Sequence, residues 1–232
     1  MQESVSTILS DSLAAIGVDV PTSFVGNTDL RAVQSLALLK EAGLELLRAY
    51  PWEFLTKPFT ITTVIDTDFY ALPEDYEYFV MQTQWDRTNH WPLLGPKSAQ
   101  EWAWLKGGLI SQGPRARYRI YNGYFWLHPV PGAEVTIAMD YISNTWLDNG
   151  TYSIAADTDL PLFDSRLLKK LFKIKYRMAK GLDAALDIKD FTNLMFSISG
   201  NSMSAPKLSM SPRISPILIG PYNVPDGSWQ VN

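Results

Sequence analysis

Residues that could carry out catalysis are few in this sequence. The chain has two histidines, His90 and His128, and no cysteine. A histidine works as a general base when its imidazole lies beside a nucleophile such as an exposed serine. The Gly-x-Ser-x-Gly motif that presents such a serine does not occur. Both histidines lie in apolar segments with strand character, so we interpret them as packed or half-exposed side chains and not as catalytic bases.

Motifs that bind phosphate or metal ions are equally scarce. Neither of the common phosphate-binding loops, Gly-x-x-x-x-Gly-Lys and Gly-x-Gly-x-x-Gly, is present. Asp157 and Asp159 could share one cation, but hard cations require six or more oxygen ligands, and a loop or helix-start role explains the pair more simply. Any two acids that meet in the fold could form the carboxylate pair of a glycoside hydrolase, and the sequence singles out none. We predict no cofactor, no metal ion and no enzymatic activity.

The composition predicts a folded protein without a membrane span. The chain has 232 residues, and 46% of them are hydrophobic, which is enough for a sizeable core. The formal charge of −4 gives no global attraction to nucleic acid or anionic lipid. No run of about 18 apolar residues occurs, and the N-terminus lacks the pattern of a secretion signal. Together with the absence of cysteine, this fits synthesis in the cytoplasm.

Three antiparallel strands in succession are predicted within residues 116–141. Asn122-Gly123 supplies the two residues with positive φ that a type I′ turn needs, so residues 118–121 should pair with residues 124–128. Residues 135–141 then resume an alternating apolar pattern and would complete a meander. The expected element is therefore a three-stranded sheet.

Further strands and one short helix are predicted before this meander. A strand begins near Phe59, and another runs from Tyr78 to Asp86 with Met81 on its apolar face. Ser98 and Glu101 have the spacing of a capping box, so residues 98–106 should form a short helix.

Helical periodicity predicts two helices before the strands and two after them. Gly17 and Gly181 should end the first and the third helix, and Asn27 or Thr28 should cap the second. This order is that of an α+β fold, a bundle of about four helices with a small antiparallel β-domain inserted at about residues 57–145. The helices are expected at residues 4–16, 28–50, 163–181 and 184–197.

The helix at residues 28–50 is more apolar than one buried face requires. Its polar residues form one narrow face, and leucine and valine side chains cover most of the remaining circumference. We expect this helix to be buried on more than one side. Leu38 lies inside the polar face, where it is either a single exposed leucine or a contact with a neighbouring subunit. A connection through Trp52 and Phe54 should plug the end of the helix into the core.

The helix at residues 163–181 concentrates positive charge. The segment from Asp164 to Gly181 carries a net charge of +6, against −10 for the rest of the chain. Its basic face either covers the core with aliphatic stems or meets a negative partner, an acidic protein or a nucleic-acid backbone. No aromatic residue is interleaved for base stacking, so sequence-specific recognition is not expected. The basic face comprises Arg166, Lys170, Lys173, Arg177 and Lys180, and the opposite, core-facing stripe comprises Leu167, Leu171, Ile174 and Met178.

The last segment, residues 201–232, has the composition of an extended arm. It is rich in proline and serine, which disfavours a packed core, yet it is too apolar for a purely solvating tail. We therefore expect residues 1–200 to form the folded core and the arm to dock on a partner. Its expected contact residues are Ile214, Ile217, Leu218, Tyr222 and Trp229.

The succession of these segments resembles the head-to-tail adaptor proteins of short-tailed bacteriophages, the family of tail tubular protein A and related head-completion adaptors. The resemblance extends from about Leu36 to Met195 and depends on the order and spacing of its motifs. They are Tyr50-Pro51-Trp52-Glu53-Phe54-Leu55, Tyr70-Ala71-Leu72-Pro73-Glu74-Asp75, the Trp102 helix, the Asn-Gly hairpin ending in His128-Pro129-Val130-Pro131, Tyr141-Ile142-Ser143, Ala156-Asp157-Thr158-Asp159-Leu160-Pro161-Leu162 and Ala179-Lys180-Gly181-Leu182-Asp183.

This resemblance implies a structural virion protein at the head-tail junction. It implies a homo-oligomeric ring, commonly of twelve copies, between the portal protein and the tail nozzle protein, with the genome passing through and with no membrane contact. The C-terminal arm would reach along the portal, and DNA could touch the ring without sequence specificity. Two alternatives stay open: a cell-wall hydrolase carried in the virion, and a nucleic-acid-binding protein that uses the basic helix at residues 166–180.

Overall fold

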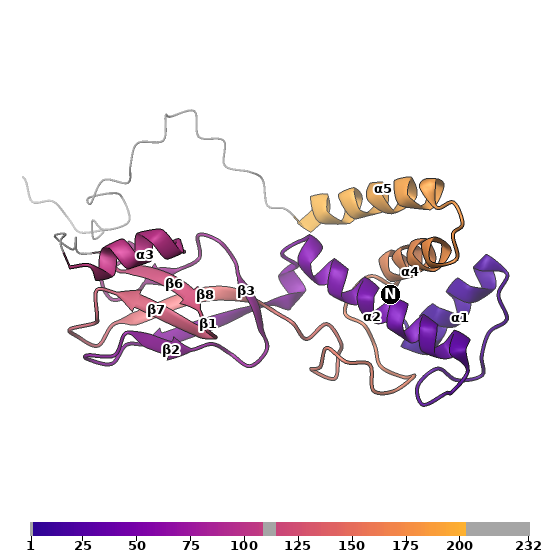
Figure 1. Ribbon diagram of the computed structural model, residues 1–232, viewed down its shortest axis with the longest axis horizontal. Coiled ribbons are helices and arrows are strands. Elements are labelled where there is room, and N and C mark those ends of the chain that lie inside the picture. The colour runs from indigo at the N-terminus through magenta and orange to yellow at the C-terminus, as the bar shows by residue number, and fades with distance from the viewer. Residues whose placement is uncertain (1, 109–114, 203–232) are drawn as a thin grey trace, which may run out of the picture. The chain divides into compact units, whose positions relative to one another are not determined.

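The computed structural model describes residues 2–108 and 115–202, and it confirms the predicted α+β class (Figure 1). The described residues fall into two compact units. A helical unit contains the residues up to Thr56 and those from Ser143 on, and a sheet unit contains Lys57–Ile142. The chain passes between the units twice, before Lys57 and after Ile142.

The helical unit is built around one central helix. Helix α4 (Ser165–Ala179) packs against α1 (Val5–Ile16), α2 (Leu30–Ala49) and α5 (Ala185–Ser202). Within this unit α5 and α2 lie on different sides of α4 (Figure 1). Helix α5 extends five residues beyond the predicted end at residue 197 and includes serine and glycine residues there, although their helix propensity is weak.

The ends of these helices follow from local hydrogen bonds. Gly17 adopts φ +79° and ends α1, as predicted. The cap of α2 is Asp29 and not Asn27 or Thr28, since the Asp29 carboxylate accepts the amide of Arg31 at 2.9 Å. Asn27 lies just before this cap, and its Oδ1 accepts the backbone amide of Asp29 at 2.9 Å. The prediction missed the cap because three neighbouring polar residues had comparable capping ability.

Aromatic residues fill the core of the helical unit. Trp52 is buried, its ring lies 5.7 Å from that of Phe163, and its indole nitrogen donates to the Leu46 carbonyl at 2.6 Å. Trp146 is also buried, and its ring stacks on that of Phe163 with the ring centroids 6.2 Å apart. Phe54, in the short 3₁₀ helix η1 (Glu53–Leu55), touches Phe163 but remains about half exposed. Of the two residues predicted to close the end of α2 against the core, Trp52 is buried and Phe54 only partly so.

The sheet unit consists of two sheets around a shared core. One sheet has five strands in the order β1-β8-β4-β5, with β3 also paired to β8, and the other has the order β2-β7-β6. Ile61, Phe79, Phe125 and Met139 belong to the core cluster that both sheets contribute to. The strands are β1 (Thr56–Thr62), β2 (Phe69–Ala71), β3 (Tyr76–Phe79), β4 (Trp85–Asp86), β5 (Trp91–Pro92), β6 (Arg117–Tyr121), β7 (Tyr124–His128) and β8 (Thr136–Ser143).

The predicted hairpin is confirmed, but the predicted meander is wrong. Tyr121 pairs with Tyr124 across Asn122 and Gly123, whose φ values are +52° and +76°, as a type I′ turn requires. β8, however, does not continue this sheet and pairs with β1, β3 and β4 in the other one. Alternation of apolar residues specifies which face of a strand is buried and not which strand lies beside it.

The single strand predicted from Tyr78 to Asp86 is divided in two. β3 ends at Phe79, Gln82 adopts φ +68°, and β4 starts at Trp85. Met81, expected on the apolar face, is 62% exposed. The helix predicted at residues 98–106 is confirmed as α3 (Ala99–Lys106), with both hydrogen bonds of the Ser98–Glu101 capping box present.

Candidate partner-binding surfaces

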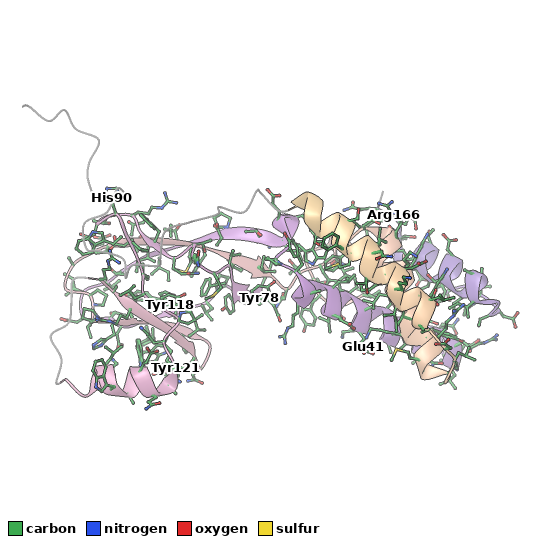
Figure 2. All side chains as sticks on the ribbon, turned by 90° about the horizontal axis from the view of Figure 1, so that it is seen from above. Glu41, Tyr78, His90, Tyr118, Tyr121 and Arg166 are labelled. Atoms are coloured by element: carbon green, nitrogen blue, oxygen red, sulfur yellow. The ribbon has the colours of Figure 1, made fainter. Side chains whose placement is uncertain are left out.

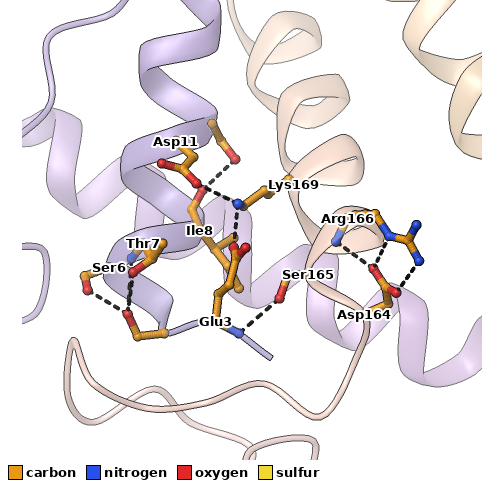
Figure 3. A network of polar contacts seen from close by, with 11 residues as sticks. Glu3, Ser6, Thr7, Ile8, Asp11, Asp164, Ser165, Arg166 and Lys169 are labelled. Atoms are coloured by element: carbon orange, nitrogen blue, oxygen red, sulfur yellow. Dashed lines mark hydrogen bonds and ion pairs between the residues drawn. The ribbon is translucent and has the colours of Figure 1, made fainter. Parts of the chain in front are cut away.

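The basic face of α4 begins at its N-terminus. The Asp164 carboxylate accepts the amide of Arg166 at 2.8 Å and pairs with its guanidinium at 2.9 Å (Figure 3). This guanidinium holds the pKa of Asp164 below its ordinary value. Arg166 itself remains largely exposed, so its charge can also reach a partner (Figure 2).

Two other members of this face hold α5 in place. Lys170 pairs with Asp190 at 3.1 Å, and Arg177 pairs with Asp187 at 2.6 Å. Both acids lie on α5, and with the Arg166–Asp164 pair, three of the five charges are thus compensated within the chain. Such pairs are partly exposed and contribute modestly to stability, but they fix the α4–α5 register.

The last two members of the basic face differ in their surroundings. Lys180 donates to the Gln34 side chain at 3.0 Å and lies 5.5 Å above the Tyr176 ring, so it has neutral neighbours. Lys173 is half-buried, and no hydrogen bond or ion pair of its side chain is present among residues 2–108 and 115–202. These two lysines carry the charge of the face that no acid compensates.

The remaining lysines of α4 tie the helix to its other neighbours. Lys169 pairs with Glu3 and with Asp11 of α1 (Figure 3). Burial alone would lower the pKa of Lys169, but the two carboxylates raise it. Lys175 likewise meets Glu41 and Glu45 of α2, at 2.8 and 2.5 Å, so these cations stabilise the bundle and are not available to a partner.

Helix α2 has an exposed apolar stripe, which corrects the expectation that it is buried on more than one side. Leu39 and Leu46 belong to its single buried face. Leu30, Val33 and Leu44 lie on the opposite side and are exposed, with Leu30 at 79%. Leu38, the leucine inside the polar face, is half-buried. The apolar excess read from the sequence is real, but it lies at the surface of this chain.

Helix α5 shows a second exposed apolar surface that the sequence did not indicate. Leu186 and Phe196 are each 80% exposed. Met178, predicted on the core stripe of α4, is also exposed, because α4 reaches its last turn there and the core ends at Tyr176. Leu182, in the connection to α5, adds to this surface.

The C-terminal contact residues lie outside the described residues. This concerns all five predicted members of the arm, Ile214, Ile217, Leu218, Tyr222 and Trp229.

The groups weighed for chemistry have structural roles. Both carboxylate oxygens of Asp157 accept backbone amides, with Oδ1 2.8 Å from the Val25 nitrogen and Oδ2 3.1 Å from that of Phe24. Asp159 accepts the amides of residues 155 and 156 at 2.8 and 3.0 Å. The loop role predicted for the two acids is therefore present. Among the described residues, no group of three or more possible metal ligands comes together.

The two histidines occupy different environments. His128 is buried against Trp102, and burial, followed by the nearby cations of Lys106 and Arg117, lowers its pKa. His90 was expected in strand-like surroundings, but it lies in the exposed turn between β4 and β5 with φ +59° (Figure 2). In the part of the chain that the structure describes, neither ring nitrogen of His128 has a hydrogen-bond partner, so no serine hydroxyl is bonded to this imidazole.

The outer face of the β6–β7–β2 sheet carries an aromatic row. The ring centroids of Tyr121 and Trp126 lie 4.8 Å apart in a stacked arrangement, and the Phe69 ring lies 5.2 Å from that of Trp126. The Arg119 guanidinium lies 4.7 Å from the centre of the Tyr121 ring. Cross-strand pairs of this kind stabilise a hairpin.

A cavity of about 130 Å³ lies near the start of β8. Asp86 is among its lining residues, and its carboxylate accepts the backbone amides of Thr88 and Asn89 in the same turn.

The model of the SU10 adaptor protein family matches residues 2–205, nearly the whole chain. The chain belongs to the SU10 adaptor protein family. This is a phage head-tail adaptor family, so the resemblance inferred from the motifs is confirmed.

Membership of the SU10 adaptor protein family makes the chain a structural adaptor of a bacteriophage and a virion component. A structural family implies a non-enzymatic role. No curated protein matches the chain. Within the described residues, no helix has the length and apolar character needed to span a membrane.

Proposed function

We propose that the chain assembles into a homo-oligomeric ring, of about twelve copies, between the portal protein and the tail nozzle protein of a phage, with the genome passing through it. The observation that carries this proposal is the pair of exposed apolar surfaces on α2 and α5 in a chain of the SU10 adaptor protein family. A ring needs two different faces on each copy, because every interface joins unlike surfaces.

The partner contacts are part of the same proposal. The helical unit and the C-terminal segment, residues 201–232, would meet the portal, and the sheet unit would meet the tail. The segment contains five prolines among its last 27 residues together with apolar and aromatic residues, which suits an extended strap on a partner surface. Lys173, Lys180 and Arg166 of the basic face would touch an acidic portal surface or the passing DNA.

The test is co-sedimentation of the purified chain with the portal protein of the same virus, followed by electron microscopy of the pellet. A stoichiometric ring stacked on the portal is expected. A chain shortened after Ser202 is the matched variant for the strap and should pellet less. A folded monomer that ignores a folded portal would overturn the proposal.

Two assays decide against the alternatives. A hydrolase would turn over peptidoglycan in a simple release assay, and we expect no turnover. A nucleic-acid-binding protein would, as an isolated chain, bind duplex DNA with a steep dependence on salt. We expect weak binding instead, because the chain outside residues 164–181 carries a net charge of −10.

A further inference from the structure

Helices α2 and α5 each present a defined outer surface. The α2 stripe consists of exposed residues spaced at i, i+3, i+7 and i+14, which share one side of a helix. The α5 face has exposed residues at i, i+3, i+7 and i+10. With a rise of ~1.5 Å per residue, the stripe is ~21 Å long and the face ~15 Å, so the two are of comparable length. The α2 stripe is Leu30, Val33, Ala37 and Leu44, and the α5 face is Leu186, Lys189, Asn193 and Phe196.

These two surfaces point in different directions. Lys175 of α4 contacts α2, whereas Lys170 contacts α5. Five residues along a helix correspond to a rotation of about 140°, so α2 and α5 lie on nearly opposite sides of α4 (Figure 1). Each outer surface is turned away from the side that faces α4. One copy therefore cannot bring its own α2 stripe and α5 face together.

The exposure of large apolar residues here is unusual for regular helices. Leu30, Leu186 and Phe196 expose about four fifths of their surface. A single exposed leucine needs no explanation, but three large apolar residues along the α2 stripe and two on the α5 face form patches of the kind that cover a partner.

Charge indicates what that partner is. Lys189 lies in the middle of the α5 face, and its side chain has no ion pair or hydrogen bond in the described part of the chain. Glu41 and Glu45 lie beside Leu44 of the α2 stripe and share the single ammonium group of Lys175. One negative charge next to the stripe is thus left for a cation such as Lys189 to meet.

We infer that the α5 face of one copy packs on the α2 stripe of the next copy, with Lys189 directed at Glu41 and Glu45. This inference rests on the proposed ring and names the surfaces that close it. The interface joins unlike faces of identical chains, so its repetition closes into a ring when the rotation from copy to copy divides a full turn, and no further partner is needed between the copies.

Cross-linking tests the contact directly, because the chain contains no cysteine. The double variant Leu44→Cys with Asn193→Cys, treated with a short bismaleimide, should give a ladder of covalent oligomers up to the full ring. Each single variant can give dimers at most. Leu44→Cys with Met81→Cys is the matched control, since Met81 is an exposed residue of the sheet unit. It should give no ladder.

Assembly measurements complete the test. Phe196→Ser should raise the concentration needed for rings, measured by mass photometry or with the portal as template, by at least about tenfold. Lys189→Glu should do the same, and adding Glu41→Lys should restore assembly. Rings that form without a ladder and ignore both substitutions overturn the inference and leave the proposed ring intact. If no ring forms alone or on the portal, the proposed function fails and the inference fails with it.

Discussion

Gly43 of α2 lies so close to Trp146 that a Cβ at position 43 would stand 2.7 Å from two carbons of the indole ring. The ring has little room to move, because Trp146 is fully buried, stacks on Phe163 and donates its indole hydrogen to the Tyr152 carbonyl at 3.1 Å. The glycine is therefore required by packing, although it costs helix propensity.

Replacing Gly43 by alanine should destabilise the helical unit. Better helix propensity would contribute up to ~1 kcal/mol, but overpacking a filled core costs about 1–3 kcal/mol and leaves the indole without its site. We expect a net loss, seen as a lower thermal midpoint. Gly200→Ala in α5 is the matched control, since nothing lies within 4 Å of the added methyl group. It should leave the midpoint unchanged or raise it.

Local signals in the sequence were sufficient for much of the fold. The Asn122-Gly123 turn, the Ser98–Glu101 capping box and the end of α1 at Gly17 each depend on neighbouring residues, and each is present as predicted. The need for a glycine at position 43 could not be read in this way. It depends on Trp146, about a hundred positions away, whose approach is known only once the helices are packed.

The loop around Asp157 joins the segment before α4 to the segment before α2. The Asp157→Ala variant would leave the amides of Phe24 and Val25 without their acceptor, at a cost of about 1–3 kcal/mol. Asp157→Asn keeps one acceptor oxygen and should lose less. Thermal melts of the three proteins measure the order.

The same melts test the earlier alternative of a cation at Asp157 and Asp159. Calcium, magnesium or a chelator should not change the midpoint of the unaltered chain, because both carboxylates already accept backbone amides. A metal-dependent midpoint that disappears in Asp157→Ala would contradict the loop role.

Two buried tyrosines should make the sheet unit sensitive to alkali. Burial raises the pKa of Tyr118 to about 12, and burial together with the hydrogen bond to Asp75 raises that of Tyr141 to about 12. A raised pKa means that the neutral form is favoured by folding, so its contribution is complete below pH 10 and is lost as the pH rises towards 12. The part of the tyrosinate absorbance that these two buried tyrosines contribute should therefore appear together with the loss of circular dichroism in this window.

The Tyr141→Phe variant separates the two contributions. It removes the hydrogen bond to Asp75 at 2.8 Å, which should cost about 1 kcal/mol at neutral pH, and it should make the alkaline transition less steep. Tyr124→Phe alters an exposed ring and should change neither property. Full tyrosinate absorbance while the circular dichroism of the sheet is still intact would contradict the prediction.

The candidate surfaces show where sequence patterns stop being informative. The apolar excess of α2 and the basic face of α4 were both visible in the sequence, but periodicity cannot tell which face a neighbour covers. Asp187 and Asp190 of α5 compensate Arg177 and Lys170 only because α5 folds back along α4. Charge counting along α4 thus overstated the charge that is free for a partner, and Lys173 is distinguished from Lys170 only in the folded chain.

Lys173 and Lys170 should consequently respond differently to neutralisation. Lys170→Gln breaks the pair with Asp190 and should lower stability by up to ~1 kcal/mol, the usual range for an exposed ion pair. Lys173→Gln removes no ion pair within the described residues and should leave the thermal midpoint unchanged, while weakening portal binding or retention of DNA in assembled particles. Sedimentation with the portal and quantification of packaged DNA measure the effect. If the double variant Lys173→Gln with Lys180→Gln binds the portal and retains DNA like the unaltered chain, these two lysines do not serve partner binding.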